Sequence, residues 1–304
     1  MLKALLPLLA MAAPLQADDG KVRTYASQIK DVDAVNSHWI EEPDGVALVD
    51  AQRLLPEAEQ ALRHLQATTG KPVTAIIITH AHTDHYGGLP VWLAAYPDAR
   101  VVLDQPTYDS ILNDSEGFIA ARSERHGDRF ATHAQLRAAL SNAQIVEDGD
   151  RLTLGGKPFT FRIYGPSEAE SHLIAVDEVD RRIFIGDLVN IGVPGVPFAN
   201  LGTWLEQLNA LENLARGKAI YQGHGPAPAP PSAIAEQRRF LQTVQSRTGE
   251  ATGDGELSAQ ELEQIVFALE AEWPFYTGVA GNTRREMLAF TVQRAAEQQG
   301  ARLP

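Results

Sequence analysis

Short apolar runs separated by turn residues dominate the first half of the chain and predict β-strands. The most regular run is 73–79, Val-Thr-Ala-Ile-Ile-Ile-Thr, which is β-branched, apolar and too short for a helix. Between strands, leucine and alanine recur at helical spacing over 54–69, and Gly70 ends that helix. The expected strands of this half span 22–25, 34–40, 46–50, 73–79 and 101–103. The alternation of strands and helices predicts an α/β fold.

The second half opens with a polar, mostly helical stretch and then returns to strands. Residues 108–140 are interpreted as a helical insertion that could form part of the rim of a site. Two hairpins follow, one over 146–164 with Gly155-Gly156 at its turn and one over 172–185. The remaining predicted elements are a helix opened by a Thr203/Glu206 capping box, a strand at 219–222, and helices at 233–246, 258–271 (opened by a Ser258/Glu261 capping box) and 283–299.

Length and charge limit the organisation and the partners. A chain of 304 residues with ordinary apolar content can bury a substantial core as one large domain, or as one domain with an appendage. We expect the main domain over 18–230 and a helical extension over 231–304 packed on the same domain. Acidic residues outnumber basic ones by 39 to 26, giving a net charge of −13, which argues against nucleic acid or an anionic membrane as the main partner.

The N-terminus predicts export. Lys3 is followed by an almost wholly apolar stretch, residues 4–15, which is too short to span a bilayer, and Ala17 precedes the acidic start Asp18-Asp19. This is the pattern of a secretory signal peptide over 1–17, so we expect a periplasmic or secreted protein without a membrane span after cleavage. An uncleaved anchor or a buried first helix is the alternative. The chain has no cysteine, which excludes disulfides and lipid attachment through a thiol.

The segment that follows the strand at 73–79 carries the densest chemistry of the chain. It reads His80-Ala81-His82-Thr83-Asp84-His85, so three histidines and an aspartate occupy six positions. Imidazole and carboxylate are the groups that zinc prefers, and only an irregular loop can bring four of them together over so short a stretch. A single histidine is more simply explained as a surface or satisfied core residue. Here an apolar strand precedes the cluster and Gly87-Gly88 follows it, and this combination predicts a metal site beyond the carboxyl end of a strand.

The His-x-His-x-Asp-His spacing resembles the signature of the metallo-β-lactamase superfamily, and the resemblance extends over about residues 35–227. It implies an αββα four-layer sandwich and two divalent metal ions, with zinc as the expected metal. Carried over, His80 and His82 would bind the first metal, and Asp84 and His85 the second. The resemblance also implies hydrolysis by a hydroxide that bridges the metals, with Asp84 as the catalytic residue that orients it.

The third ligand of the first metal is where the chain departs from the common pattern. Most relatives present a histidine after a Gly-Pro segment, but in register from Gly165-Pro166 that position is Glu168, and His172 follows four residues later. The alkylsulfatase-like members of the superfamily use a glutamate there, and a carboxylate is an acceptable zinc ligand. We therefore favour Glu168 and keep His172 as the alternative.

Three further positions complete the expected site by resemblance. Asp187 stands in a Gly-Asp motif at the end of a strand and would bridge both metals, and His224 in Gly-His-Gly-Pro would be the last ligand of the second metal. Asp50 ends its strand where relatives often carry an aspartate that braces the metal loop.

These features predict a hydrolase that acts on a small-molecule ester, lactone, thioester or sulfate ester. A β-lactamase is the nearest alternative, although those enzymes generally lack an aspartate at position 187 and carry histidine where Glu168 stands. A di-iron redox enzyme is a second alternative, because sites rich in carboxylates and histidines also suit iron. The flavin domain that accompanies such oxidases has no counterpart in the helical C-terminal region. A non-catalytic metal-binding protein is the remaining possibility. Oligomeric state and exact substrate are not encoded in a readable pattern.

Overall fold

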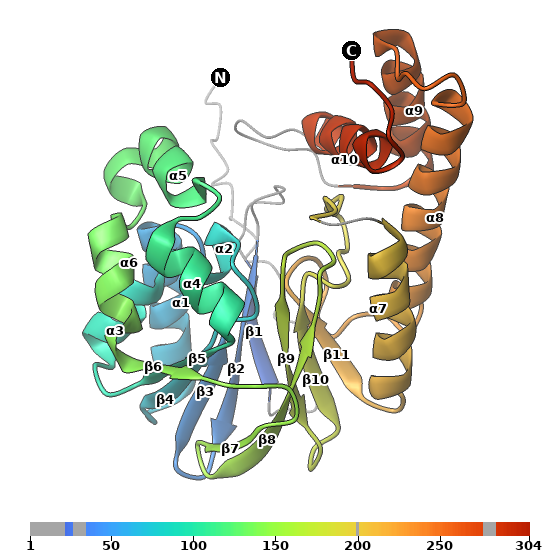
Figure 1. The fold of residues 1–304 in the computed structure, drawn as a ribbon. Helices are drawn as coiled ribbons and strands as arrows, with labels where there is room; N and C mark the ends of the chain where they lie inside the picture. The colour runs from blue at the N-terminus through green and yellow to red at the C-terminus, as the bar shows by residue number, and fades with distance from the viewer. Residues whose placement is uncertain (1–21, 27–34, 199–200, 276–283) are drawn as a thin grey trace, which may run out of the picture.

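Two β-sheets pack face to face, and helices cover both outer faces, in the order of layers αββα (Figure 1). The computed structural model describes residues 22–26, 35–198, 201–275 and 284–304. The predicted signal peptide and the expected mature start at Asp18 lie outside these residues. Three apolar clusters fill the spaces between the layers, one between the two sheets and one beneath each layer of helices.

The first sheet has six strands in the order of the sequence, β1 to β6. β1 to β3 form an antiparallel meander, whereas β3, β4, β5 and β6 run parallel to their neighbours. Its central strand β4 is wholly apolar on both faces at its C-terminal end, as expected for a strand buried between two layers. The strands are β1 (Val22–Ala26), β2 (Asn36–Glu42), β3 (Gly45–Val49), β4 (Val73–Ile77), β5 (Arg100–Leu103) and β6 (Ala143–Ile145).

The second sheet has five strands in the order β11-β10-β9-β8-β7, antiparallel except for the parallel pair of β10 and β11. The facing sides of the two sheets meet through residues such as Val49, Ile77, Phe161 and Phe184, all buried. The strands are β7 (Arg151–Leu154), β8 (Lys157–Tyr164), β9 (His172–Asp177), β10 (Arg182–Gly186) and β11 (Ala219–Gln222).

Helices before residue 143 cover the first sheet, and those after residue 200 cover the second (Figure 1). The first group is α1 (Leu55–Thr68), α2 (Thr83–Tyr86), α3 (Leu89–Ala95), α4 (Gln105–Asn113), α5 (Phe118–His126) and α6 (His133–Ala139), with the short 3-10 helices η1 (Gly127–Arg129) and η2 (Leu140–Asn142). The second group is α7 (Leu201–Leu214), α8 (Ala233–Ala251), α9 (Ala259–Glu272) and α10 (Arg284–Gln298).

The C-terminal helices share a core with the second sheet. Leu241, Val266 and Val292 from α8, α9 and α10 belong to the same buried cluster as Ile174 and Ile185 of β9 and β10. The predicted Ser258/Glu261 capping box is present at the start of α9. The extension therefore packs on the sheet that it follows.

Three local expectations were wrong. Thr203 does not cap α7, because that helix already includes Leu201, so the Thr203/Glu206 pattern lies inside it. The predicted hairpin over 146–164 begins only at Arg151, and the preceding 143–145 pairs with β5 in the other sheet. The metal-motif segment is not wholly irregular, since residues Thr83–Tyr86 form one helical turn, α2.

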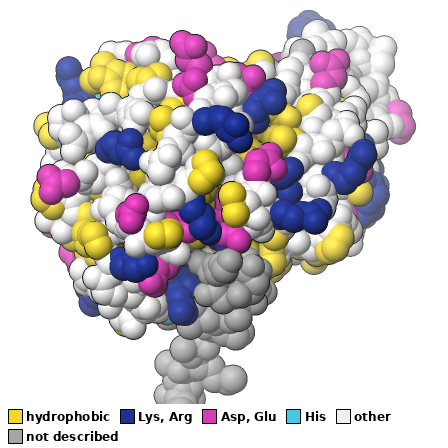
Figure 2. Space-filling view, turned by 90° about the horizontal axis from the view of Figure 1, so that it is seen from below, with side chains coloured by type: hydrophobic (Ala, Val, Ile, Leu, Met, Phe, Trp, Pro, Cys, Tyr) yellow, Lys and Arg dark blue, Asp and Glu magenta, His cyan; other side chains and the backbone are white. Residues whose placement is uncertain are grey.

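The described surface mixes both signs of charge. On the face seen in Figure 2, lysine and arginine side chains lie interspersed with acidic and apolar ones. None of the helices in the described ranges is both long enough and apolar enough to cross a bilayer.

Candidate metal centre

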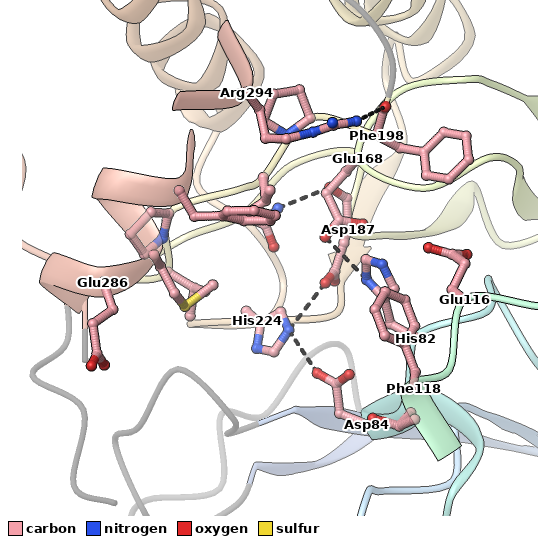
Figure 3. Close-up of a pocket in the computed structure, with 18 of the residues that line it drawn as sticks. His82, Asp84, Glu116, Phe118, Glu168, Asp187, Phe198, His224, Glu286 and Arg294 are labelled. Atoms are coloured by element: carbon pink, nitrogen blue, oxygen red, sulfur yellow. Dashed lines mark hydrogen bonds and ion pairs between the residues drawn. The ribbon is translucent and has the colours of Figure 1, made fainter. Parts of the chain in front are cut away.

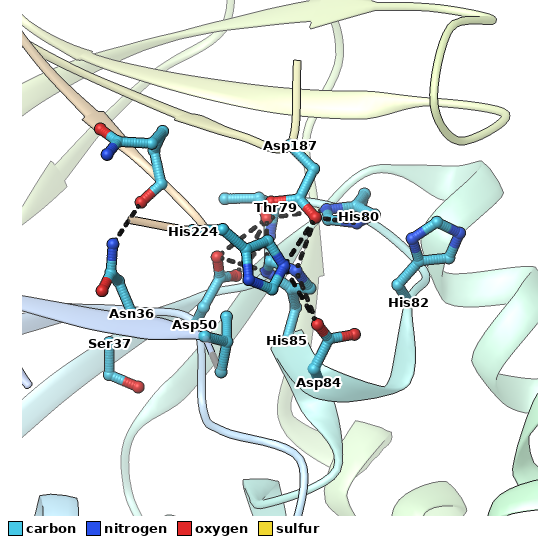
Figure 4. Close-up of polar contacts among 12 residues, drawn as sticks. Asn36, Ser37, Asp50, Thr79, His80, His82, Asp84, His85, Asp187 and His224 are labelled. Carbon is cyan, nitrogen blue, oxygen red and sulfur yellow. Dashed lines mark hydrogen bonds and ion pairs between the residues drawn. The ribbon is translucent and has the colours of Figure 1, made fainter. Parts of the chain in front are cut away.

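The site lies at one edge of the sandwich, where strands of both sheets end. β4 leads into His80, β10 into Asp187 and β11 into His224, while β9 starts at this same edge with His172. β9 and β10 are antiparallel, so the start of one meets the end of the other. Segments distant in the sequence thus deliver their polar side chains to a single place (Figure 4).

Seven predicted residues come together in two adjacent groups that share Asp187. Within each group, one donor atom per residue can be chosen so that all lie within 4.8 Å of one another. The first group is His80, His82, Glu168 and Asp187, and the second is Asp84, His85, Asp187 and His224. Asp187 Oδ2 lies 3.9 Å from His80 Nε2, 3.4 Å from His85 Nε2 and 3.1 Å from His224 Nε2. This carboxylate therefore stands between the two groups, as expected of a bridging ligand.

Both candidates for the remaining position of the first group reach the site. Glu168 Oε1 lies 3.1 Å from His82 Nδ1, and its Oε2 lies 3.6 Å from His80 Nε2. His172 is fully buried, and its ring stacks on that of His80 with 4.7 Å between centroids. His172, the first residue of β9, therefore faces the site. Only Glu168 belongs to the compact donor group, so the choice between the two remains a prediction.

Hydrogen bonds fix which ring nitrogen of His80 and His85 faces the centre. Asp50 Oδ2 lies 2.8 Å from His85 Nδ1, which leaves His85 Nε2 directed at Asp187. Thr79 Oγ1 lies 3.1 Å from His80 Nδ1, and Asp50 Oδ1 accepts from both the N–H and the hydroxyl of Thr79. Partners of this kind orient metal-binding imidazoles and select their tautomer. Asp50 thus contacts both His85 and Thr79, and the bracing role implied by the resemblance remains a prediction.

The segment that carries Asp50 is itself held in an unusual backbone conformation. Asp50 and Gln52 have φ values of 61° and 71°, which residues other than glycine adopt rarely. In this conformation Ala51 N donates to His85 O at 2.6 Å, and the buried Arg53 contacts Asp84 Oδ1 at 3.0 Å. The strained turn therefore supports Asp84 and His85, the two residues of the second donor group that lie on α2.

Asn36 holds the loop of His224, a role that no local sequence pattern indicates. Its side-chain amide donates to Gln222 O at 3.0 Å and to Gly225 O at 2.9 Å, and its backbone N–H donates to Gly223 O at 2.7 Å. A Cβ added at Gly223 would lie 2.0 Å from Asp187 Oδ1, so the loop approaches the centre more closely than a side chain permits. Asn36, Thr79 and Arg53 are the supporting residues that the sequence reasoning missed.

The electrostatics of the site are those of buried anions in contact with imidazoles. Burial raises the pKa of Asp187, but the adjacent His224 and His85 outweigh this and hold the pKa well below its usual value. Burial likewise opposes ionisation of Asp84, and Arg53 and His85 reverse it, so the pKa of Asp84 is also low. Burial together with neighbouring His85 lowers the pKa of His80, which favours the neutral form that binds metals.

The residues present fit a pair of cations. His80 Nε2, His85 Nε2, His172 Nε2, Glu168 Oε2 and Asp187 Oδ1 are buried without a hydrogen-bond partner among the described residues, and four of them belong to the two donor groups. Buried polar atoms without partners are costly, and two divalent ions would satisfy them and balance three buried carboxylates. The donor set of histidine nitrogen and carboxylate oxygen suits zinc or iron.

A third group of possible metal ligands lies at the opposite end of the strands, but we do not interpret it as a metal site. Glu42, Asp177 and Asp180 approach one another there. Lys157 Nζ lies 3.0 Å from Glu42, and Arg182 Nη2 lies 2.8 Å from Asp180. Arg182 Nη1 also lies 3.7 Å from Asp177, so each of the three acids has a cationic partner. We interpret this group as an ion-pair network that joins the two sheets.

A pocket of about 680 Å³ opens above the metal centre, with His82, Asp84, Glu168, Asp187 and His224 among its lining residues. Phe118 and Arg122 of α5 line the pocket, as does Glu116, which directly precedes the N-cap residue Gly117 of that helix. The helical insertion therefore forms part of the rim. Figure 3 shows Glu286 and Arg294 of α10 across the pocket from Glu116 and Phe118. The size suits a small molecule.

Comparisons with known proteins identify a family and several relatives. The model of the metallo-beta-lactamase superfamily matches residues 31–232. Hydroxyacylglutathione hydrolase of Stenotrophomonas maltophilia is 30% identical over 36% of this chain and 43% of its own. The alkyl/aryl-sulfatase BDS1 of Saccharomyces cerevisiae is 22% identical over 88% of this chain and 48% of its own. The chain spans between 30% and 65% of the length of the first curated relatives that it matches.

Among solved structures, a beta-lactamase domain protein from Burkholderia ambifaria superposes with a TM-score of 0.65 at 19% identity, over 95% of this chain and 89% of that one. At this identity the likeness concerns the fold alone. It agrees with the order of layers described above.

Proposed function

The chain belongs to the metallo-β-lactamase superfamily, whose members are hydrolases, and we propose that it is a dinuclear metal hydrolase of an ester, lactone, thioester or sulfate ester. The observation that carries this proposal is the pair of adjacent donor groups joined through Asp187 at the floor of a pocket. We propose zinc as the metal, because the donors are histidines and carboxylates in two groups of four.

When bound, two divalent ions lower the pKa of a water molecule and polarise the oxygen of the bond to be cleaved. Arg53 fixes Asp84 through Oδ1, which leaves Oδ2 near His85 and His224, at 3.6 and 3.3 Å. This oxygen can orient the attacking water by accepting a hydrogen bond from it. For an ester, the water oxygen bonds to the acyl carbon as the bond to the alcohol oxygen breaks. The alcohol leaves with one of the two water protons, and the other stays on the carboxylic acid product or passes to solvent when that acid ionises.

A hydrolase screen of the purified protein tests the proposal. Panels of carboxylic esters, thioesters, lactones and alkyl sulfates would be compared with a β-lactam, using wild type, Asp84→Asn and the control Asp109→Asn, whose carboxylate is exposed on α4. We expect hydrolysis of at least one ester class, a loss of about 100-fold or more in Asp84→Asn, and no loss in the control. Hydrolysis of the β-lactam alone would establish the alternative activity. No hydrolysis of any panel would contradict the proposal.

We also propose that the protein is exported, on the basis of the apolar segment 4–15 and Ala17. Mass spectrometry of the protein recovered from the periplasm or medium should find a chain that starts at or near Asp18. Retention of Met1 in that fraction would contradict this.

A further inference from the structure

The segment between β10 and α7 and helix α10 line the pocket mostly with apolar side chains, beside the charged Glu286 and Arg294. We define the apolar wall as Val193, Val196, Pro197, Phe198, Met287 and Phe290. Phe198 and Phe290 expose 37% and 52% of their surface, although large aromatic side chains usually bury most of theirs.

The apolar wall is held in place by α10. Thr291 Oγ1 donates to Gly195 O at 3.1 Å, and Arg294 Nη2 donates to Phe198 O at 3.0 Å (Figure 3). The other side of the segment is tied to the metal centre, because Phe198 N donates to Ser167 O at 2.9 Å, next to Glu168. The wall is therefore a built surface whose near end lies beside the donor residues.

We infer that the substrate of this site carries an apolar alkyl or acyl chain that lies along the apolar wall, with the bond to be cleaved at the metal centre. This rests on the proposed function and specifies its substrate class. The floor of the pocket is polar and carries the donor residues, so the reacting group lies there. Removal of the apolar wall from water favours an apolar group along it. Glu116 and Arg122 also line the pocket and suit the polar part of the substrate.

The test uses the full metal-loaded protein and p-nitrophenyl esters of acetate, butyrate, hexanoate and octanoate below their aggregation concentrations. Full burial of a methylene would raise kcat/KM by about fourfold. For partial burial we expect about twofold to threefold for each extra methylene, so the octanoate-to-acetate ratio should lie between about 60 and 700. Phe290→Ala should lower that ratio by about tenfold. Phe267→Ala is the matched control, because Phe267 is 69% exposed on α9 and does not line the pocket.

Binding of free octanoate and acetate, measured by calorimetry on the same proteins, separates this inference from the proposed function. Tighter binding of octanoate that Phe290→Ala weakens, without hydrolysis of any ester, would support the wall and contradict the hydrolase. Hydrolysis that is independent of chain length, with octanoate bound no more tightly than acetate, would overturn the inference, since it would mean that another part of this chain covers the wall. A loss of chain-length preference in Phe267→Ala equal to that in Phe290→Ala would overturn it as well.

Discussion

Glu168 Oε2 lies 3.6 Å from His172 Nε2, and neither buried atom has a hydrogen-bond partner among the described residues. A carboxylate and an imidazole that are four positions apart thus converge on the first metal position. Glu168 belongs to the compact donor group with His80 and His82, whereas His172 stacks behind His80 with its Nδ1 3.1 Å from Ser167 Oγ. The geometry favours the carboxylate as the ligand and the imidazole as its neighbour.

Alanine substitution at each position distinguishes these roles. Glu168→Ala should empty the first metal position and abolish turnover together, because a ligand is lost. His172→Ala should cost only about 10–100-fold in metal affinity or activity. Glu170→Ala, an exposed carboxylate on the same loop, is the control and should change neither. Metal content by elemental analysis and kcat are the measurements. The opposite order of effects would assign the ligand to His172.

Asn36 should affect the second metal more than the first. Asn36→Ala removes the two side-chain hydrogen bonds to the carbonyls on either side of His224, so that histidine loses its fixed position. We expect affinity for the second metal to fall by about 10–100-fold with the first nearly unchanged, as measured by titration with a competing chelator. Asn142→Ala breaks a comparable bond to Pro97 O on the surface and serves as control. Equal weakening of both metals would show that Asn36 acts on overall stability instead.

His38 should make the folded state sensitive to acid. Burial lowers the pKa of its ring to about 4, compared with 6.5 for the unperturbed side chain. The unfolded chain binds a proton at His38 more readily than the folded chain does. The contribution of neutral His38 to the stability of the folded state is therefore complete above pH 6.5 and is lost as the pH falls from there toward 4.

Between pH 7 and pH 5 the His38 effect amounts to about 2 kcal/mol. Urea unfolding of wild type and His38→Gln at both values measures it, because the difference between the two proteins cancels effects shared by both. His38→Gln should show the smaller acid loss, and an equal loss in both proteins would contradict the buried neutral state.

The sequence predicted the parts of the site that local pattern controls. The His80–His85 segment follows directly on a buried strand and was predicted as a metal site from its own pattern. Asp187 and His224 were assigned through the resemblance to the superfamily, from their short glycine-containing motifs at strand ends. The supporting residues were not predictable, because Asn36 reaches the centre through contacts that span 186 positions or more, and nothing nearby in the sequence marks it. Thr203 was wrongly predicted to cap α7. The helix already includes Leu201, and a capping pattern has no effect inside a helix, where tertiary context overrides local preference.

Two metal ions should be bound by the seven residues of the two donor groups, which are His80, His82, Asp84, His85, Glu168, Asp187 and His224. Elemental analysis of protein purified without chelators tests this most directly. Wild type should carry close to two divalent ions per chain, and the control Asp109→Ala should match it. Asp187→Ala should lose metal from both positions, since Asp187 contributes to both donor groups. One ion or none in wild type after gentle purification, or an unchanged metal content in Asp187→Ala, would contradict the two-metal centre.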